Sequence, residues 1–271
     1  MCIKKDFGLP IISVGNIVVG GSGKSPFVME LAKRHEGACV VLRGYKRASS
    51  GVLVVSNKGK ILCEVHESGD EAMMIAKALP QASVIVSENR DKGIKRAKEL
   101  GAKVIFLDDA FHKCYEKFDI VIDVDAPNNF CLPIGPYRLP RFFLRYANLV
   151  VKEGRDFTRN VMIKNPTAKM VLITAIANPK RLLAFVPKDM PHYFFPDHHG
   201  FSKGEIDAII QKERPTSLLV TAKDIVKLQK FGYPLSLLQL QLEIKEEVFA
   251  KIDSYIKDYH AKKDANGSDA A

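Results

Sequence analysis

The stretch VGNIVVGGSGKSP, residues 14–26, decides the fold that we expect for this chain of 271 residues. It lies between an apolar run and a segment with helical spacing, and a glycine-rich loop in that context predicts a phosphate-binding site. Val18 stands where the general G-x-x-x-x-G-K-[ST] pattern has its first glycine, which mainly serves the turn. The alternative is a glycine-rich turn that binds no ligand.

The residues of this loop have separate expected roles. Backbone N–H groups would turn toward phosphate oxygens, and the start of the following helix adds a partial positive charge. Lys24 would neutralise the β- and γ-phosphates of ATP and so counts as catalytic, and Ser25 would offer its hydroxyl to Mg²⁺. The expected nucleotide-binding residues are Gly20, Gly21, Ser22, Gly23, Lys24 and Ser25.

A loop of this kind also needs an acidic residue at the end of a neighbouring strand to hold the metal ion. KVIFLDD, residues 103–109, supplies two after an apolar run. Because ligands of open α/β folds collect at the carboxyl ends of the strands, we expect Asp108 and Asp109 to bind Mg²⁺ together with Ser25. The alternative for Asp109 is a helix or turn cap.

The pattern around this loop predicts an α/β fold with a P-loop NTPase-like parallel sheet and a second, smaller α/β domain. We assign residues 1–152 to the first domain and 153–245 to the second, with a helix at about 246–262 and a disordered tail at 263–271. The expected strands of the first domain are 10–15, 38–42, 83–86, 103–107 and 119–124, and those of the second are 171–174, 193–195, 217–221 and 237–243. VLVVSNKGKIL, residues 52–62, predicts a β-hairpin that turns at 57–59.

Composition narrows the class of protein. A net charge of +10 favours an acidic partner. In RLPRFFLRY, residues 138–146, arginines interleave with aromatic residues, which suits a lipid headgroup boundary, although a solvated helix edge would look the same. No RNA-binding signature or helix-turn-helix pattern is present, so we expect no nucleic-acid partner.

Five widely spaced cysteines predict reduced thiols in a cytosolic protein, and no apolar run reaches the ~18 residues of a membrane span.

Two further segments offer groups for proton transfer. ESGDEAMMIA, residues 67–76, contains Asp70, which on its own would most simply cap the following helix together with Ser68. FPDHHGF, residues 195–201, contains His198 directly after an acid. A histidine in that position suits a proton shuttle but is also common on surfaces.

Taken together, these segments and others in the same order resemble the tetraacyldisaccharide 4′-kinase family of lipid A synthesis. The resemblance rests on VGNIVVGGSGKSP, RGYKR (43–47), GDE (69–71), DDAF (108–111), LPIGPYR (132–138), TAIANPKR (174–181), DHHGF (197–201) and TAKD (221–224). No single segment is specific, but the ordered set is.

The resemblance implies transfer of the ATP γ-phosphate to the 4′-hydroxyl of tetraacyldisaccharide 1-phosphate at the cytoplasmic face of a bacterial inner membrane. It also implies two domains joined by a two-stranded ribbon, with the last helix returning to the first domain. By position, Asp70 matches the catalytic base and His198 its partner, and Asp108 with Asp109 matches the magnesium-binding pair. Plausible ligands for substrate phosphates are Arg43, Arg47, Arg90 and Arg138.

The chain departs from the family pattern at several positions. Leu139 replaces a glutamate, Lys113 a histidine and Ala222 a glutamate, which leaves a nucleotide-binding, membrane-associated regulatory protein with weakened or lost kinase activity as the alternative function. Family members typically begin with a hydrophobic helix, whereas this sequence starts almost at the first strand. We therefore expect either a missing N-terminal segment or docking on an anionic membrane surface through residues 138–146.

Overall fold

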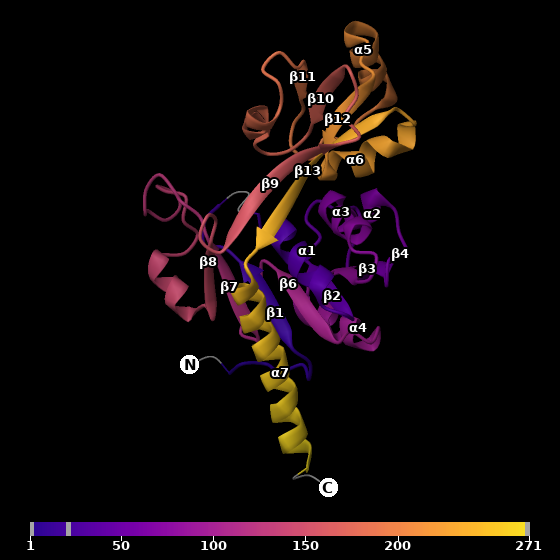
Figure 1. Cartoon of the computed structure of the whole chain (residues 1–271). Helices are drawn as coiled ribbons and strands as arrows, with labels where there is room; N and C mark the ends of the chain where they lie inside the picture. Colours follow the sequence, from indigo (N-terminus) through magenta and orange to yellow (C-terminus); the bar gives the residue numbers. More distant parts are fainter. Residues whose placement is uncertain (1–2, 20–22, 269–271) are drawn as a thin grey trace.

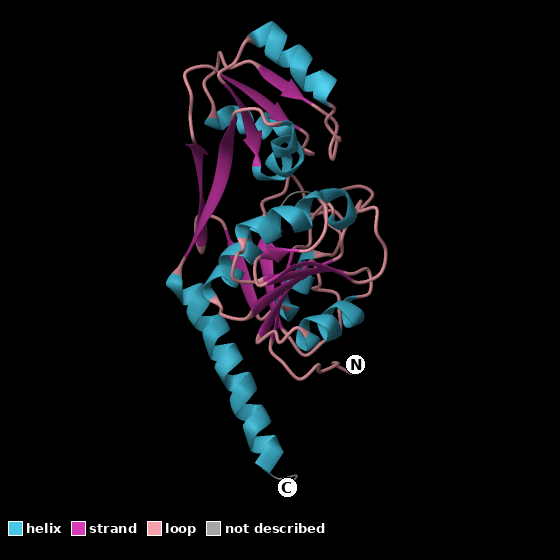
Figure 2. Cartoon of the chain, turned by 90° about the vertical axis from the view of Figure 1, so that its right-hand side faces the viewer, coloured by secondary structure: helices cyan, strands magenta, loops and turns pink. Residues whose placement is uncertain are grey.

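The computed structural model describes residues 3–19 and 23–268, and this part of the chain forms an eight-stranded and a five-stranded sheet. Figures 1 and 2 show the two sheets one above the other, with helices against each and one long C-terminal helix running along the larger unit. The predicted α/β fold class with a large parallel sheet is confirmed.

The larger sheet has the order β4-β3-β5-β2-β6-β1-β7-β8. Its strands are parallel except at β3, which pairs antiparallel with both β4 and β5. The predicted hairpin is thus β3 with β4, and it forms one edge of the sheet. The strand bounds are β1 Ile11–Gly15, β2 Ala38–Leu42, β3 Leu53–Asn57, β4 Lys60–Ile61, β5 Ser83–Val86, β6 Val104–Asp108, β7 Phe118–Asp123 and β8 Leu149–Lys152.

Strand alternation divides this core into two layers. Ile12 packs with apolar residues of α1 (Lys24–Arg34) and α3 (Asp70–Ala78), whereas Ile11 packs on the other face with Ile94 of α4 (Arg90–Glu99). Both faces of the parallel strands are therefore buried, and their continuous apolar runs follow from that. The short helix α2 (Val65–Ser68) precedes α3, and the 3₁₀ helix η1 (Arg141–Tyr146) lies in the long segment before β8.

The smaller sheet has the order β11-β10-β12-β13-β9, with β9 antiparallel to β13 and the other pairs parallel. Its strands are β9 Phe157–Lys164, β10 Met170–Thr174, β11 His192–Phe194, β12 Ser217–Thr221 and β13 Leu235–Ile244. Its helices are η2 Pro179–Phe185, α5 Lys203–Glu213, α6 Ala222–Leu228 and η3 Gln229–Phe231. The long β9–β13 ribbon leads from β8 into this sheet and back to the last helix, as Figure 1 shows.

That last helix, α7 (Glu246–Ser268), packs on the larger unit. Val248 and Ile252 are buried in the α1–α3 layer, and Arg34 of α1 pairs with Glu246. The prediction of a disordered tail from residue 263 is wrong as far as Ser268, because the helix continues to that residue and Lys263 contacts Asp6 at 2.6 Å. Residues 269–271 lie outside the described part of the chain.

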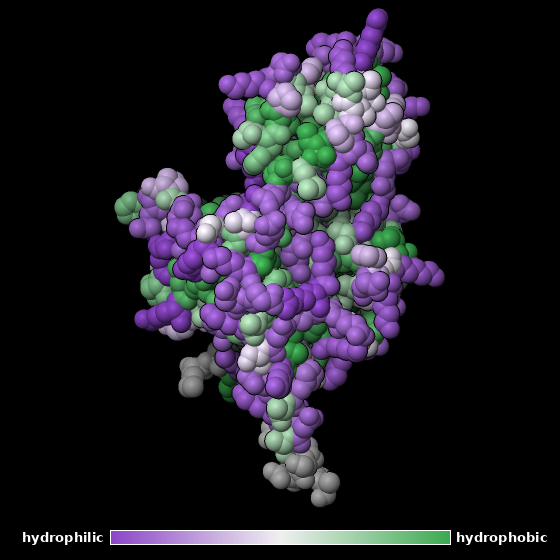
Figure 3. All heavy atoms as spheres, viewed as in Figure 1, coloured by the Kyte–Doolittle hydropathy of each residue, from purple (hydrophilic) through white to green (hydrophobic). Residues whose placement is uncertain are grey.

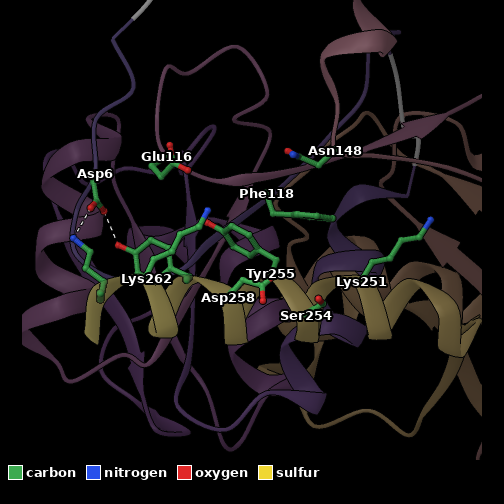
Figure 4. Close-up of a pocket in the computed structure, with 11 residues that line it drawn as sticks. Asp6, Glu116, Phe118, Asn148, Lys251, Ser254, Tyr255, Asp258 and Lys262 are labelled. Carbon is green, nitrogen blue, oxygen red and sulfur yellow. Dashed lines mark hydrogen bonds and ion pairs between the residues drawn. The ribbon is translucent and has the colours of Figure 1, made fainter. Parts of the chain in front are cut away.

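Between α7 and the start of β7 lies a cavity of about 590 Å³. Figure 4 shows Phe118 and Tyr255 there, with Asp6 bonded to side chains from the end of α7. This cavity lies at the amino ends of β7 and β8. Since ligands of open α/β folds bind at the carboxyl ends, it does not coincide with the expected nucleotide site.

The cysteines differ in part from expectation. Cys39, Cys63 and Cys131 are free thiols, but Cys114 is disulfide-bonded, so the prediction of reduced thiols throughout is wrong. Burial raises the pKa of Cys39 to about 12, which makes that thiol unreactive. Among the described helices, none combines the length and apolarity needed to cross a membrane.

Candidate active site

The phosphate loop joins the end of β1 to α1, as the sequence predicts. Gly23 precedes the helix with φ 84°, a left-handed conformation that favours glycine. The Lys24 ammonium lies 3.1 Å from Asn16 Oδ1 and 3.9 Å from Asp109 Oδ1. Gly20, Gly21 and Ser22 lie outside the described residues.

Carboxylates from two other elements meet Ser25. Its hydroxyl donates to Glu71 at the start of α3, and it lies 3.4 Å from Asp108 Oδ2 at the end of β6. The other Asp108 oxygen, Oδ1, is buried with no hydrogen-bond partner among the described residues. Burial, and then the Glu71 carboxylate, raise the pKa of Asp108 to about 7, although Lys24 opposes this. The cluster therefore has an excess of negative charge that a cation would relieve.

Asp109 differs from Asp108 in exposure and in its partner. Its backbone has φ 57°, and its half-exposed carboxylate accepts from Arg138 Nη1 at 3.2 Å. Arg138 is held near the site because the segment around it pairs with the chain leading into the phosphate loop, with Arg138 N donating to Ile17 O at 2.7 Å. Asp109 thus faces both Lys24 and Arg138 at the mouth of the site.

Asp70 and His198 come from the two different sheet units and meet. Asp70 is the first residue of α3, and His198 follows β11 with φ 66°. His198 Nδ1 lies 3.3 Å from Asp70 Oδ2, and both side chains are largely buried. Since Glu71 follows Asp70 and bonds Ser25, this pair stands next to the phosphate loop.

The remaining predicted arginines occupy different positions. Arg90 is buried and donates through Nη2 to the carbonyl of Asp108, so it supports the end of β6. Arg47 is held by Glu88 and by the Gly51 carbonyl, and Arg43 is exposed on the same loop. The structure thus brings Arg138 and Arg90 to the carboxylate cluster, but it ties Arg47 to Glu88 instead.

The sequence analysis did not single out several residues of this site. Glu71 lies next to Asp70 in the quoted GDE segment, but its contact with Ser25 depends on how α3 packs against α1. Lys227 of α6 lies 3.2 Å from Asp70 Oδ2 at the start of α3 and 3.3 Å from Asp224 Oδ1 of its own helix, and no local pattern connects α6 with α3. Asn16, which accepts a hydrogen bond from Lys24, is the third residue that the sequence analysis did not single out.

Comparison with known proteins decides the family. A family model described as tetraacyldisaccharide-1-P 4′-kinase matches residues 1–169 and 158–257. The chain belongs to this family. The resemblance inferred from the ordered motifs is therefore confirmed.

Curated tetraacyldisaccharide 4′-kinases support the same assignment over most of the chain. The protein of that name from Aliarcobacter butzleri is 49% identical over 267 residues, which cover 94% of this chain and 85% of that protein. One from Helicobacter pylori strain ATCC 700392 / 26695 is 48% identical over 259 residues and covers 94% and 83%. A crystal structure of LpxK from Aquifex aeolicus in complex with ATP superposes with a TM-score of 0.74 at 28% identity and covers 94% and 90%.

Proposed function

We propose that this protein transfers the γ-phosphate of ATP to the 4′-hydroxyl of tetraacyldisaccharide 1-phosphate, the reaction for which its relatives are named. The observation that carries the proposal is the meeting of Asp70 and His198 beside a phosphate loop. A base next to a triphosphate site is what phosphoryl transfer to an alcohol requires. The regulatory alternative is not favoured, since the relatives are named as kinases and this pair of residues is assembled.

Nucleotide binding falls to the phosphate loop and the start of α1. Backbone N–H groups of Gly20, Gly21, Ser22 and Gly23 would bind phosphate oxygens, with the dipole of α1 behind them. Lys24, aligned by Asn16, would neutralise charge on the β- and γ-phosphates. Because this charge grows on the transferring group, most of the rate enhancement should come from these fixed positive groups.

The carboxylate cluster fits Mg²⁺. No three His, Cys, Asp or Glu side chains in the described ranges are grouped as a metal site by themselves, so nucleotide phosphates and water would complete the coordination. The buried Asp108 Oδ1 without a partner offers one oxygen, and Ser25 and Asp109 offer others. Bound there, Mg²⁺ would neutralise charge on the β- and γ-phosphates.

Proton transfer falls to the Asp70–His198 pair. As the acceptor oxygen bonds to the γ-phosphorus and the bond to the ADP oxygen breaks, the hydroxyl proton passes to Asp70. His198, bonded to Oδ2, orients this carboxylate and helps to carry the transferred proton. Arg138, at the mouth of the site, is the candidate ligand for a phosphate or sugar of the acceptor.

A transfer assay tests this function. Folded protein, ATP labelled in the γ-phosphate, Mg²⁺ and the disaccharide acceptor should yield a labelled lipid product, and an acceptor with its 4′-hydroxyl blocked should yield none. Removal of divalent metal by a chelator should stop the reaction. The assignment would be overturned if folded protein gave no transfer under any divalent-metal condition.

We further propose that the protein docks on an anionic membrane at the cytoplasmic face, where its acylated acceptor would lie. The support is the projecting segment before β8, where Phe130, Leu132, Ile134, Phe142 and Tyr146 are exposed. Arg145 lies over the rings of Phe142 and Tyr146 at 5.3 and 4.8 Å. Figure 3 shows apolar residues among the hydrophilic ones on this projecting lobe.

Vesicle co-sedimentation tests this docking. Binding to vesicles with anionic lipid should weaken as salt rises, because the arginine contribution is screened. Phe142→Ser combined with Ile134→Ser should weaken it further. Ile61→Ser on β4, at the opposite edge of the sheet, is the control and should bind as the unchanged protein does. Binding indifferent to salt and anionic lipid would contradict the proposal.

A further inference from the structure

A buried lysine of the smaller unit reaches the candidate base. Lys227 belongs to α6, and only 9% of its side chain is exposed. Its ammonium lies 3.2 Å from Asp70 Oδ2, the same oxygen that His198 Nδ1 approaches at 3.3 Å. Both groups therefore make their closest approach to Asp70 at Oδ2. Oδ1 is thereby left to accept a proton from a substrate.

Lys227 is itself fixed from behind. It lies 3.3 Å from Asp224 Oδ1 and donates to the His199 carbonyl at 3.2 Å. Asp224 is fully buried and accepts hydrogen bonds from Thr174 Oγ1 at 2.7 Å, Thr221 Oγ1 at 2.7 Å and Ala175 N at 3.2 Å. These donors stand at the ends of β10 and β12, so the carboxyl edge of the smaller sheet determines where the ammonium lies.

The surrounding contact between α6 and α3 is apolar. Val226 is buried in the same cluster as Met73, and Ala222 and Ile225 pack against it. Apolar packing supplies the cohesion of this contact, whereas a buried ion pair adds little net stability because the cost of desolvation offsets its attraction. The Lys227–Asp70 contact is therefore better explained by orientation of Asp70 than by stability.

We propose that Lys227 is a positioning residue for Asp70. This inference rests on the proposed function. The ammonium, held by Asp224 and the His199 carbonyl, acts with His198 to fix Oδ2 of Asp70 and so turns Oδ1 toward the acceptor hydroxyl. Lys227 also makes the position of the base depend on the smaller unit, since that unit supplies both groups that hold it.

Steady-state kinetics of four variants test the proposal. Lys227→Met should lower kcat on the order of 10- to 100-fold, the range expected when a buried charged group loses its charged partner, with KM for ATP within about twofold. Lys227→Arg, which keeps the charge, should recover part of the loss. Asp224→Asn, which weakens the support of Lys227 but leaves Asp70 intact, should lower kcat less. Lys230→Met, an exposed lysine just after α6, is the matched control and should leave both constants unchanged.

A double-mutant cycle with Asp70→Asn gives the sharper result. If Lys227 acts through Asp70, adding Lys227→Met to Asp70→Asn should reduce kcat by less than about twofold more. Melting temperatures measured in parallel show whether each variant folds. If Lys227→Met does not fold, the kinetics of Asp224→Asn test the proposal instead.

Three results would overturn the inference. The first is an unchanged kcat in both Lys227→Met and Asp224→Asn, and the second is a loss of ATP affinity in Lys227→Met as large as its loss of kcat. The third is that the losses in kcat are fully additive in the double-mutant cycle. Failure of the proposed function gives a different result. If Asp70→Asn retained full activity, the assigned base would be wrong. If Asp70→Asn lost activity while Lys227→Met did not, the proposed function would stand and Lys227 would not position Asp70.

Discussion

Replacing Asp108 with asparagine should stabilise the ligand-free protein and remove its stabilisation by Mg²⁺ and ATP. Asp108 is buried beside Glu71, and burial followed by this neighbour raises its pKa to about 7 from the usual 3.8. The folded protein therefore keeps a proton that the unfolded chain releases near pH 4. As pH rises from about 4 to 7, the free energy of unfolding falls, because the folded protein must then leave an ionised carboxylate buried.

The magnitude follows from the size of the shift. A rise of about 3 in the pKa of Asp108 corresponds to a loss of up to about 4 kcal/mol in the free energy of unfolding at pH 8. Part of this loss comes from repulsion by the Glu71 carboxylate. Asparagine cannot ionise, so Asp108→Asn should be more stable than the unchanged protein by up to that amount at pH 8, and the difference should disappear toward pH 4. By contrast, ligand at about 100 times its Kd adds roughly 2.7 kcal/mol to the unchanged protein, and the variant should gain little of this.

Calorimetry at pH 8 and pH 5, with and without Mg²⁺ and ATP, measures both effects. Glu36→Gln, which removes an exposed carboxylate, is the control and should change stability by no more than about 0.5 kcal/mol. The reasoning is refuted if Asp108→Asn is less stable than the unchanged protein at pH 8, or if Mg²⁺ and ATP stabilise both to the same extent.

Three further predictions concern the base and the last helix. Asp70→Asn should lower turnover on the order of 10²- to 10⁴-fold while calorimetric ATP affinity stays nearly constant; an equal loss of ATP binding would make Asp70 a ligand. Ile252→Ala removes a fully buried side chain from α7 and should cost about 2–5 kcal/mol in denaturant unfolding; a negligible cost would contradict the packing of this helix. Burial works against ionisation of Asp6, but hydrogen bonds from Lys263, Tyr259 and Gly8 N prevail and lower its pKa to about 2, so its stabilisation is present above about pH 4 and is lost as pH falls toward 2. The melting-temperature difference from Asp6→Asn should shrink over that range, and a constant difference would argue against the contact.

Much of the larger sheet was predictable because its strands are buried on both faces and read as continuous apolar runs, as in ACVVL of β2. Strands β8 and β9 were not predicted from local patterns, although the family resemblance implied a two-stranded ribbon between the two domains. In β9, FTRNVMIK, burial alternates along the strand but residue type does not, and its partner β13 follows some 70 residues later. Local patterns do not contain such a pairing.

The residues of the candidate site also divide into those that could be predicted from the sequence and those that could not. The alternation of strands and helices predicts a parallel sheet, in which the carboxyl ends of the strands lie at one edge. Four predicted residues lie near such ends: Lys24, Ser25, Asp108 and Asp109. The proximity of Asp70 to His198 could be expected only through the family resemblance, because they come from different units. Glu71 and Lys227 lie on helices, where charged residues usually face solvent, and only the packing of α3 against α1 and α6 gives them partners.

The prediction of a disordered tail was wrong for a related reason. Its composition is polar, but alanine and lysine favour helix, and the contact of Lys263 with Asp6 ties the end of α7 to the N-terminal segment. A tertiary contact between the two ends of the chain thus decides a conformation that composition alone left open.

The central claim, that residues from both sheet units converge on one transferring phosphate, is tested most directly by a crystal structure with a non-hydrolysable ATP analogue and Mg²⁺. We predict the terminal phosphate between Lys24 and the Asp70–His198 pair, with the metal ion touching Ser25 and Asp108. A nucleotide bound with its terminal phosphate out of reach of Asp70 and His198 would contradict the claim.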